Sequence, residues 1–83
     1  MEKLNIEFTK KSYEDYLNLP SNYKSLVDKT LKKFKNGIPI DIKPIKGEKD
    51  TYRIRIGKYR LLLIRISENV LVIKIKKRED IYK

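Results

Sequence analysis

The sequence contains no cysteine and no histidine among its 83 residues. Without cysteine, the chain has no disulfide framework and offers no thiolate nucleophile or thiolate metal ligand. Without histidine, it lacks the side chain that proteins use most often as a general base and as a metal ligand. Any catalysis must therefore use Lys, Arg, Tyr, Asp or Glu, and we expect no metal and no cofactor.

Long apolar stretches are absent as well. No run in the sequence approaches the ~20 residues that a membrane-spanning helix needs. The first residues, Met1 to Asn5, lack the apolar segment of a signal peptide. A chain of this length is typical of one domain. We therefore expect a single domain over residues 1–83, located in the cytoplasm.

Positive charge is in excess and unevenly distributed. The formal net charge is +10 at pH 7. Residues 1–45 carry nine Lys or Arg against six Asp or Glu, whereas residues 46–83 carry twelve against five. A small domain with one strongly basic half favours a polyanionic partner, RNA or DNA before an anionic membrane. The alternative interpretation is a lysine-rich chain whose charges are simply solvated.

The N-terminal half predicts one strand and two helices. Apolar and polar residues alternate from Leu4 to Phe8, as in a strand with one buried face. Thr9 is a suitable N-cap for a helix that begins at Lys10 and ends before Pro20, and Ser12 is a second possible N-cap. Ser21 is a suitable N-cap for a second, amphipathic helix.

The second helix is predicted to end at Asn36-Gly37. Few residues separate the two helices, so we expect an antiparallel helical hairpin. Glu14 and Asp15 are interpreted as surface charges of the first helix.

The C-terminal half predicts three strands after a connection. Residues 38–51 contain prolines and Gly47, which argue against a helix or a central strand there. Short turns at Gly57-Lys58 and at 67–69 separate strands expected over residues 52–56, 59–66 and 70–76. The expected fold is α+β, of order β-α-α-β-β-β, with the helical hairpin packed on a twisted, mainly antiparallel sheet.

The last two strands are apolar on both faces. The middle strand alternates Leu61 and Leu63 with Leu62 and Ile64. The last strand has Val70 and Val72 on one face and is expected to have Leu71, Ile73 and Ile75 on the other. One helical hairpin covers only one face. Either the strands lie centrally under further cover from this chain, or a partner chain covers the second face, and we expect the partner.

Arginine alternates with isoleucine along the first of these three strands. This period places Arg53 and Arg55 on one face and apolar residues on the other. Arg60 begins the next strand, and Lys77-Arg78 end the last one. Guanidinium groups match the spread negative charge of a reacting phosphodiester with fixed bidentate geometry. The pattern therefore indicates either a site for RNA backbone binding or cleavage, or an arginine-rich solvated face.

Three segments together resemble the RelE/ParE toxin superfamily, on its RelE side. Residues 45–47 read Ile-Lys-Gly, residues 52–60 read Tyr-Arg-Ile-Arg-Ile-Gly-Lys-Tyr-Arg, and residues 77–82 read Lys-Arg-Glu-Asp-Ile-Tyr. The expected order of one strand, a helical hairpin and three strands also resembles that of the superfamily, so the resemblance covers nearly the whole chain. The resemblance implies the toxin of a toxin–antitoxin pair, a metal-independent mRNA interferase that cuts mRNA in the ribosomal A site. A 2′-hydroxyl would attack the adjacent phosphate and leave a 2′,3′-cyclic or 3′ phosphate.

The resemblance also implies roles for individual residues. Arg53 and Arg55 stand at two basic positions, one of which acts as base in some family members. Arg60 and Arg78 would stabilise the transition state, with Arg78 also protonating the leaving 5′-oxygen, and Tyr82 would orient or stack on the substrate. RNA contacts are expected from four lysines: Lys46, Lys58, Lys76 and Lys77.

The sequence departs from the family pattern in three places. Arginine at positions 53 and 55 stays protonated and is a poor general base. Lys77 stands where many relatives have histidine, and Leu63 replaces a common tyrosine. The identity of the general base therefore stays open.

The expected partner is a small, acidic RelB-like antitoxin, disordered alone, that folds across the apolar second face and masks the arginines. Two other functions remain as alternatives: a ParE-like toxin that inhibits DNA gyrase, and a non-catalytic nucleic-acid-binding domain.

Overall fold

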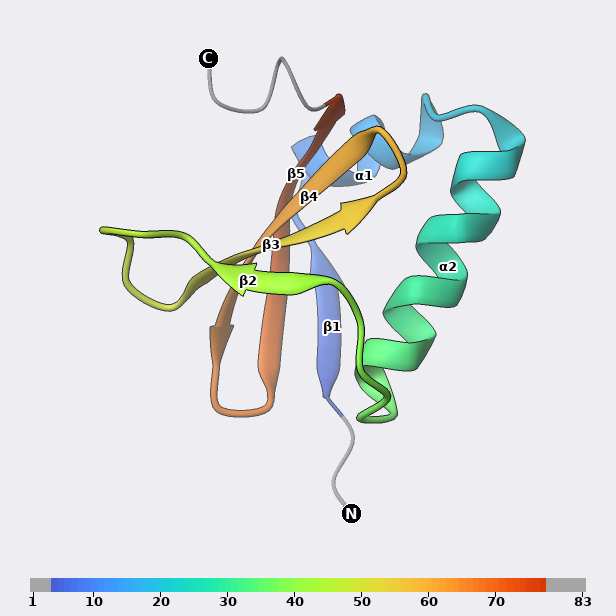
Figure 1. The fold of residues 1–83 in the computed structure, drawn as a ribbon. Coiled ribbons are helices and arrows are strands. Elements are labelled where there is room, and N and C mark those ends of the chain that lie inside the picture. The colour runs from blue at the N-terminus through green and yellow to red at the C-terminus, as the bar shows by residue number, and fades with distance from the viewer. Residues whose placement is uncertain (1–3, 78–83) are drawn as a thin grey trace.

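A computed structural model describes residues 4–77 as two helices and five strands in α+β arrangement (Figure 1). The predicted order is confirmed, with one strand added. The elements are β1 (Asn5–Phe8), α1 (Lys10–Leu17), α2 (Ser21–Lys35), β2 (Ile42–Pro44), β3 (Thr51–Ile56), β4 (Tyr59–Ile66) and β5 (Asn69–Lys77).

The strands form one mixed sheet in the order β1-β5-β4-β3-β2. The N-terminal strand β1 pairs in parallel with β5, and all other pairs are antiparallel. The added strand, β2, lies in the segment predicted to be a connection. Pro44 has no N–H to donate to a ladder, which is tolerated because β2 is an edge strand.

The predicted helix ends are partly confirmed. The Thr9 hydroxyl accepts a hydrogen bond from the Ser12 N–H at 3.0 Å and caps α1. The prediction that Ser21 caps α2 is wrong: Pro20 is the N-cap, without a side-chain hydrogen bond, and Ser21 is the first helical residue. Proline suits this boundary because its fixed φ is compatible with entry into a helix.

The C-terminal end of α2 is confirmed at Asn36 and Gly37. Gly37 has a φ of 76°, and the Ile38 N–H reaches back to the Lys33 carbonyl at 2.9 Å. This is the left-handed glycine ending that satisfies the last carbonyls of a helix. Neither helix within residues 4–77 is long and apolar enough to cross a membrane.

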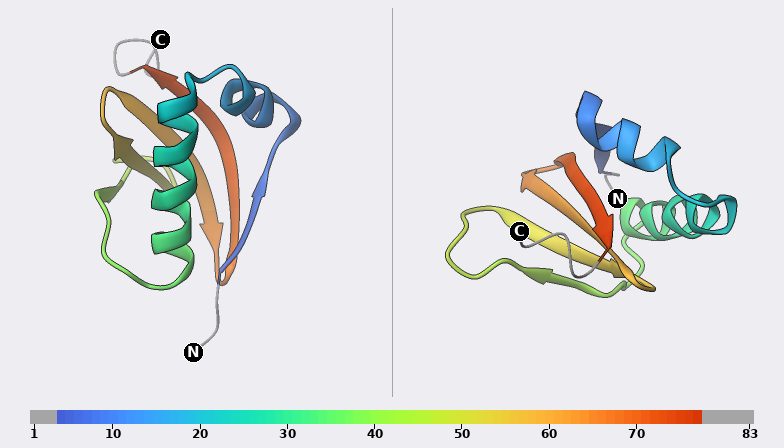
Figure 2. Two further views of the ribbon diagram at one scale, coloured as in Figure 1. Left: turned by 90° about the vertical axis from the view of Figure 1, so that its right-hand side faces the viewer. Right: turned by 90° about the horizontal axis from the view of Figure 1, so that it is seen from above.

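The two consecutive helices pack on the sheet, as predicted, but they do not lie antiparallel to each other. In Figures 1 and 2, α1 crosses near the start of α2 at a steep angle and does not lie along it. The reason is that α1 packs against the outer edge of β5, beyond the point where β1 ends. There the Ser12 hydroxyl donates to the Val72 carbonyl at 2.7 Å, and the Asp15 carboxylate accepts from the Ile75 N–H at 3.2 Å.

Asp15 was predicted to be a surface charge, and this is wrong. The residue is only 8% exposed, because it satisfies a backbone donor on the free edge of β5. An unpaired N–H at a covered strand edge would be energetically unfavourable. The first helix therefore serves to close the sheet edge as well as to bury apolar surface.

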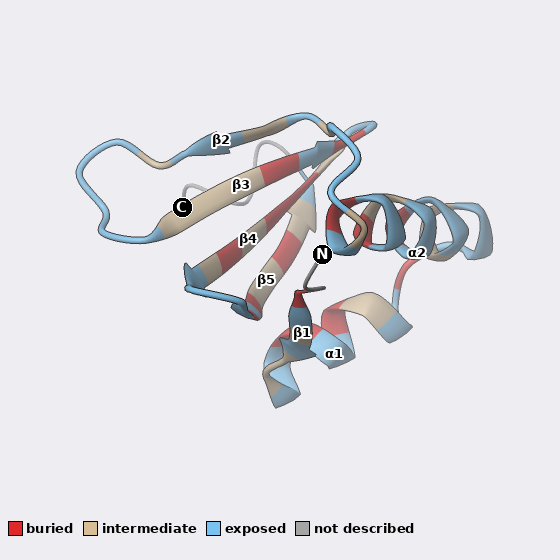
Figure 3. Cartoon of the chain, turned by 90° about the horizontal axis from the view of Figure 1, so that it is seen from below, coloured by how far each residue is buried: buried red, intermediate tan, exposed pale blue. Residues whose placement is uncertain are grey.

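The hydrophobic core lies between α2 and one face of the sheet (Figure 3). Helical spacing places Val27, Leu31 and Phe34 of α2 on the buried side, and strand alternation supplies the sheet side. The buried apolar residues are Leu4, Leu19, Val27, Leu31, Phe34, Ile54, Ile56, Leu61, Leu63, Val70, Val72 and Ile75.

A β-bulge in β5 overturns one predicted face assignment. Leu63 pairs with Val72, but Leu62 pairs with Lys74, so Ile73 is an extra residue in β5. An extra residue reverses the alternation beyond it. Ile75 therefore lies on the core side and is 3% exposed, although the sequence pattern had placed it with Leu71 and Ile73.

We call the sheet face turned away from α2 the outer face. One end of it is apolar, with Leu62, Ile64 and Ile66 of β4 beside Leu71 of β5. Ile66 is 62% exposed and Leu71 is 37% exposed. The predicted second apolar face is therefore present, and whether a partner covers it stays a prediction.

Candidate functional site

The arginines of β3 lie on the outer face, as the alternation predicts. Ile54 lies between the two arginines in the sequence and Ile56 follows Arg55. They are 0% and 5% exposed, respectively, and belong to the core. The side chain of Arg55 is 47% exposed, whereas that of Arg53 is 14% exposed. Arg55 is thus the more accessible of the two guanidinium groups.

A tight turn brings Arg60 opposite Arg55. The turn between β3 and β4 consists of Gly57 and Lys58, and Gly57 has a φ of 59°. A side chain there would be strained and would also approach the Tyr23 ring, 3.0 Å from an added Cβ. The glycine therefore maintains the register in which Arg55 and Arg60 are directly paired.

The register continues to β5 and produces a row of three cations. Arg55 pairs with Arg60, and Arg60 pairs with Lys76. Neighbouring strands lie about 4.8 Å apart, so the Cα atoms of this row span roughly 10 Å. We call Arg55, Arg60 and Lys76 the first cationic row.

A second cationic row runs beside the first, one pleat further along the sheet. Lys43 pairs with Arg53, Arg53 with Leu62, and Leu62 with Lys74. Lys43 and Lys74 were not predicted as site residues. The sequence did not indicate Lys74, because only the bulge at Ile73 turns it to the outer face. It did not indicate Lys43, because the sequence predicts a connection, not a strand, where β2 lies.

Asp41 is a further residue that sequence reasoning missed. It precedes β2, and its carbonyl accepts a hydrogen bond from the Arg55 N–H at 3.0 Å. Its carboxylate lies between the two arginines of β3, with Oδ1 3.7 Å from Arg53 Nη1 and Oδ2 3.7 Å from Arg55 Nε. The one indication in the sequence was that the polar residues Asp41 and Lys43 alternate with the apolar Ile42, which is typical of a strand whose polar side chains point away from the core.

Arg60 is the least accessible of the predicted catalytic residues in the described part of the chain. It is 4% exposed, and its Nη1 lies 3.4 Å from the Tyr59 carbonyl. Burial restricts the rotamers that this side chain can adopt. A guanidinium held in this way is pre-organised, which is what electrostatic stabilisation of a transition state requires.

The four predicted RNA-binding lysines are not all in one place. Lys58 lies in the turn beside the first row, and Lys76 belongs to that row, where its Nζ lies 3.3 Å from Asp15 Oδ1. Lys77 pairs with Tyr59 and so faces away from Arg60. Lys46 lies in the β2–β3 loop beyond Thr51, about 13 Å or more from Arg55 along the strand. Arg78 and Tyr82 lie outside the described residues.

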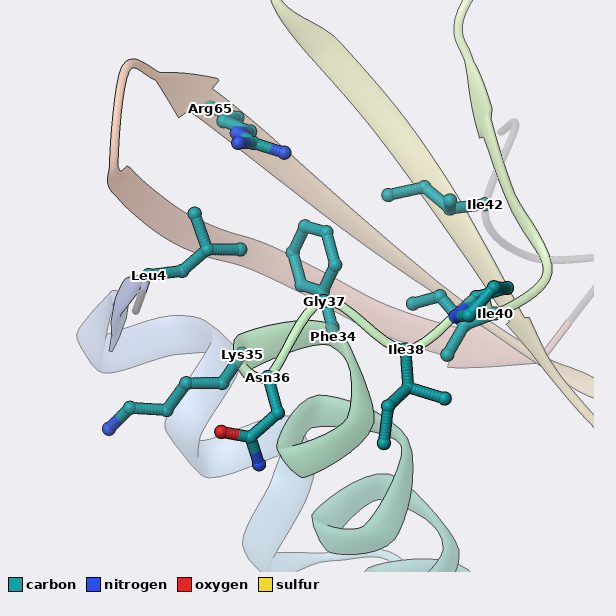
Figure 4. Close-up of a pocket in the computed structure, with 10 residues that line it drawn as sticks. Leu4, Phe34, Lys35, Asn36, Gly37, Ile38, Ile40, Ile42 and Arg65 are labelled. Carbon is teal, nitrogen blue, oxygen red and sulfur yellow. The ribbon is translucent and has the colours of Figure 1, made fainter. Parts of the chain in front are cut away.

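A separate hollow of about 560 Å³ lies on the other side of the sheet (Figure 4). Phe34, Ile38 and Ile40 line it from the end of α2 and the segment that follows, and Arg65 lies at its rim. The Arg65 guanidinium lies 5.9 Å from the centre of the Phe34 ring, a cation–π distance. Arg65 is therefore not part of the cationic rows.

The pKa of Tyr16, a residue of α1, is raised by a hydrogen bond to α2. The Tyr16 hydroxyl donates a hydrogen bond to Asp28 Oδ1 at 2.8 Å, which links α1 to α2. This hydrogen bond to a carboxylate, followed by burial, raises the pKa of Tyr16 above its usual value of 10.0. Because this hydrogen bond joins the two helices, the raised pKa bears on the stability of the fold.

No protein-family model matches the chain. A curated protein of Methanocaldococcus jannaschii, "Putative toxin RelE1", is 38% identical over 90 residues, which cover 98% of this chain and 97% of the relative. A chain in the RelB-RelE antitoxin-toxin complex from Methanococcus jannaschii matches with a TM-score of 0.79 at 25% identity, over 90% of this chain and 93% of that chain.

Two further solved structures share the fold. A double mutant of E. coli toxin RelE in the free state matches with a TM-score of 0.79 at 23% identity, over 99% of this chain and 90% of that chain. The archaeal RelE-RelB complex from Pyrococcus horikoshii matches with a TM-score of 0.72 at 20% identity, over 94% of this chain and 98% of that chain.

Proposed function

The chain belongs to the RelE toxin family, and from this membership we propose that it is the toxin of a type II toxin–antitoxin system that cuts mRNA in the ribosomal A site. The reaction is metal-independent endonucleolytic cleavage in the cytoplasm. The observation that carries the proposal is the pair of cationic rows on the outer face.

The rows suit a phosphodiester because they combine guanidinium groups with rigid strands. Arg55 is accessible, and Arg60 lies directly opposite it on the neighbouring strand. Guanidinium donors in fixed positions stabilise charge that develops on the non-bridging oxygens of a phosphate. The lysines on either side add point charges that hold the RNA backbone.

In the proposed reaction the 2′-hydroxyl of one nucleotide attacks its own 3′ phosphate. The arginines Arg53, Arg55 and Arg60 stabilise the pentacoordinate state, and the bond to the 5′-oxygen of the next nucleotide breaks. Arg78 assists the leaving oxygen and Tyr82 orients the substrate. The products are a 2′,3′-cyclic phosphate and a 5′-hydroxyl.

The proposed protein partner is a RelB-like antitoxin. Solved relatives include RelB-RelE complexes, and the outer face of this chain offers apolar residues beside a strongly cationic patch. An acidic segment with apolar side chains would cover Ile66 and Leu71 while its carboxylates neutralise the arginines.

The test is a cleavage assay on ribosomes programmed with a defined mRNA, read by primer extension. Cuts confined to the A-site codon and absent on naked RNA are expected. If well-folded protein makes no cuts, the proposal is wrong. A gyrase supercoiling assay and a salt titration of RNA binding would then distinguish a gyrase inhibitor from a plain nucleic-acid-binding domain.

A further inference from the structure

Asp41 places a carboxylate directly on the cationic outer face. Its two oxygens approach Arg53 Nη1 and Arg55 Nε at 3.7 Å each, and its side chain is 45% exposed. Within residues 4–77 these oxygens accept no hydrogen bond, so their lone pairs are open to a ligand. Asp15, the carboxylate that contacts Lys76, is instead 6% exposed and already accepts from a backbone N–H.

Cleavage by an internal 2′-hydroxyl needs an acceptor for the hydroxyl proton. The chain has no histidine, and arginine remains protonated and has no acceptor atom. A carboxylate is an acceptor at neutral pH and carries no proton of its own to lose. The two arginines of the first cationic row can thus hold the phosphate but cannot take the proton, and the third member, Lys76, is paired with Asp15, its Nζ 3.3 Å from Oδ1.

We propose that Asp41 is the general base of the cleavage reaction, an inference that rests on the proposed function. A phosphate held by Arg55 lies beside Asp41 Oδ2, and the 2′-hydroxyl is bonded to the same ribose as that phosphate. The proton of the 2′-hydroxyl passes to the Asp41 carboxylate while its oxygen bonds to phosphorus. The bond from phosphorus to the 5′-oxygen breaks, this oxygen takes a proton from water, and Asp41 later returns its proton to water.

Asp41 has a structural role, because it places a negative charge 3.7 Å from Arg53 Nη1, which is buried and has no hydrogen-bond partner within residues 4–77. Its other contact, at 3.7 Å to the half-exposed Arg55, contributes little to stability. A carboxylate beside a phosphate-binding arginine also repels the phosphate, so it weakens binding of the substrate. A general base explains why an anion stands at this point, because the proton acceptor must be adjacent to the phosphate.

This reasoning predicts opposite effects on binding and on chemistry. Asp41→Asn removes one negative charge and keeps the shape of the side chain. Affinity for ribosome-bound mRNA should stay the same or rise by up to about fivefold. The single-turnover cleavage rate at saturating protein should fall about 100-fold or more.

The experiment measures both quantities for the wild type, Asp41→Asn and Asp50→Asn. Asp50 is an exposed residue of the β2–β3 loop with a φ of 56°, a conformation that asparagine also adopts, so its variant is a control with the same change of charge. Asp41→Ala is assayed with and without sodium formate, whose anion can replace a missing carboxylate. Formate should restore part of the rate to Asp41→Ala and leave the wild type unchanged.

Each outcome decides the proposal. Slow cleavage with intact binding, together with formate rescue, supports Asp41 as the base. Wild-type cleavage by Asp41→Asn overturns this inference and leaves the proposed function standing. Loss of binding together with cleavage also overturns it, in favour of a role in positioning the arginines. If the wild type itself makes no cuts, both the proposed function and this inference fail.

Discussion

Arg55 and Arg60 lie directly opposite each other across the β3–β4 pair, on the same face of the sheet. Like charges at directly opposed positions destabilise an antiparallel sheet. Asp41 offsets part of this repulsion through its contact with Arg55. Such a juxtaposition is expected where function, and not stability, selects the residues.

Replacing Arg55 with threonine should separate stability from activity. Threonine favours strands and removes the repulsion with Arg60, so the free energy of unfolding should stay the same or rise by up to about 1 kcal/mol. Cleavage on programmed ribosomes should fall at least tenfold. Urea denaturation and primer extension measure the two effects, and a clear loss of stability would contradict this account of the pair.

Arg60→Lys should abolish most of the activity while it keeps the positive charge. Lysine cannot reproduce the planar, bidentate contact of a guanidinium, and removal of one pre-organised donor slows comparable reactions about 100- to 1000-fold. Arg65→Lys is the matched control, because Arg65 lies over Phe34 on the other side of the sheet. Equal cleavage rates for the two variants would exclude Arg60 from the site.

Lys43 and Lys74 should each contribute one phosphate contact. Replacing either with alanine should weaken RNA binding for all sequences alike. For a contact to single-stranded RNA, the slope of log K against log salt concentration should become shallower by about 0.7. Lys29→Ala, an exposed lysine of α2, should change neither quantity. Fluorescence anisotropy over a range of salt concentrations gives both numbers, and an unchanged slope for Lys74→Ala would mean that the second row does not contact RNA.

Tyr16→Phe should reduce stability in a way that depends on pH. The hydrogen bond to Asp28 raises the pKa of Tyr16 in the folded state, so its stabilisation is fully present below the unfolded value of 10.0 and is lost as the pH rises through the folded pKa. At pH 7 the variant should be less stable by about 0.5 kcal/mol, as for a hydrogen bond near the surface.

The difference between wild type and Tyr16→Phe should shrink above pH 10. Tyr13→Phe serves as the control, since the Tyr13 hydroxyl has no hydrogen bond within residues 4–77. Chemical denaturation at pH 7, 9 and 11 provides the comparison, and a difference that is constant with pH would show that the hydrogen bond to Asp28 does not cause it.

The sequence by itself determined the local elements and the direction of most side chains. Alternation along β3 places Arg53 and Arg55 on one face because successive strand residues point to opposite sides. Helical spacing identified the buried side of α2. Gly57 indicated a turn and Gly37 a helix end, because glycine readily adopts the positive φ that both positions have. These features depend on residues close together in the chain.

Only the tertiary structure decided which charges meet on the outer face. The extra residue Ile73 reverses the alternation of β5, so that Lys74 and Lys76 join the arginines and Ile75 enters the core. Pairing of β2 with β3 brings Asp41 between Arg53 and Arg55, and the free edge of β5 draws Asp15 inside. These three features are a bulge, an edge pairing and a covered strand edge. Each depends on which distant segment lies beside the strand, and local sequence patterns carry no information about that.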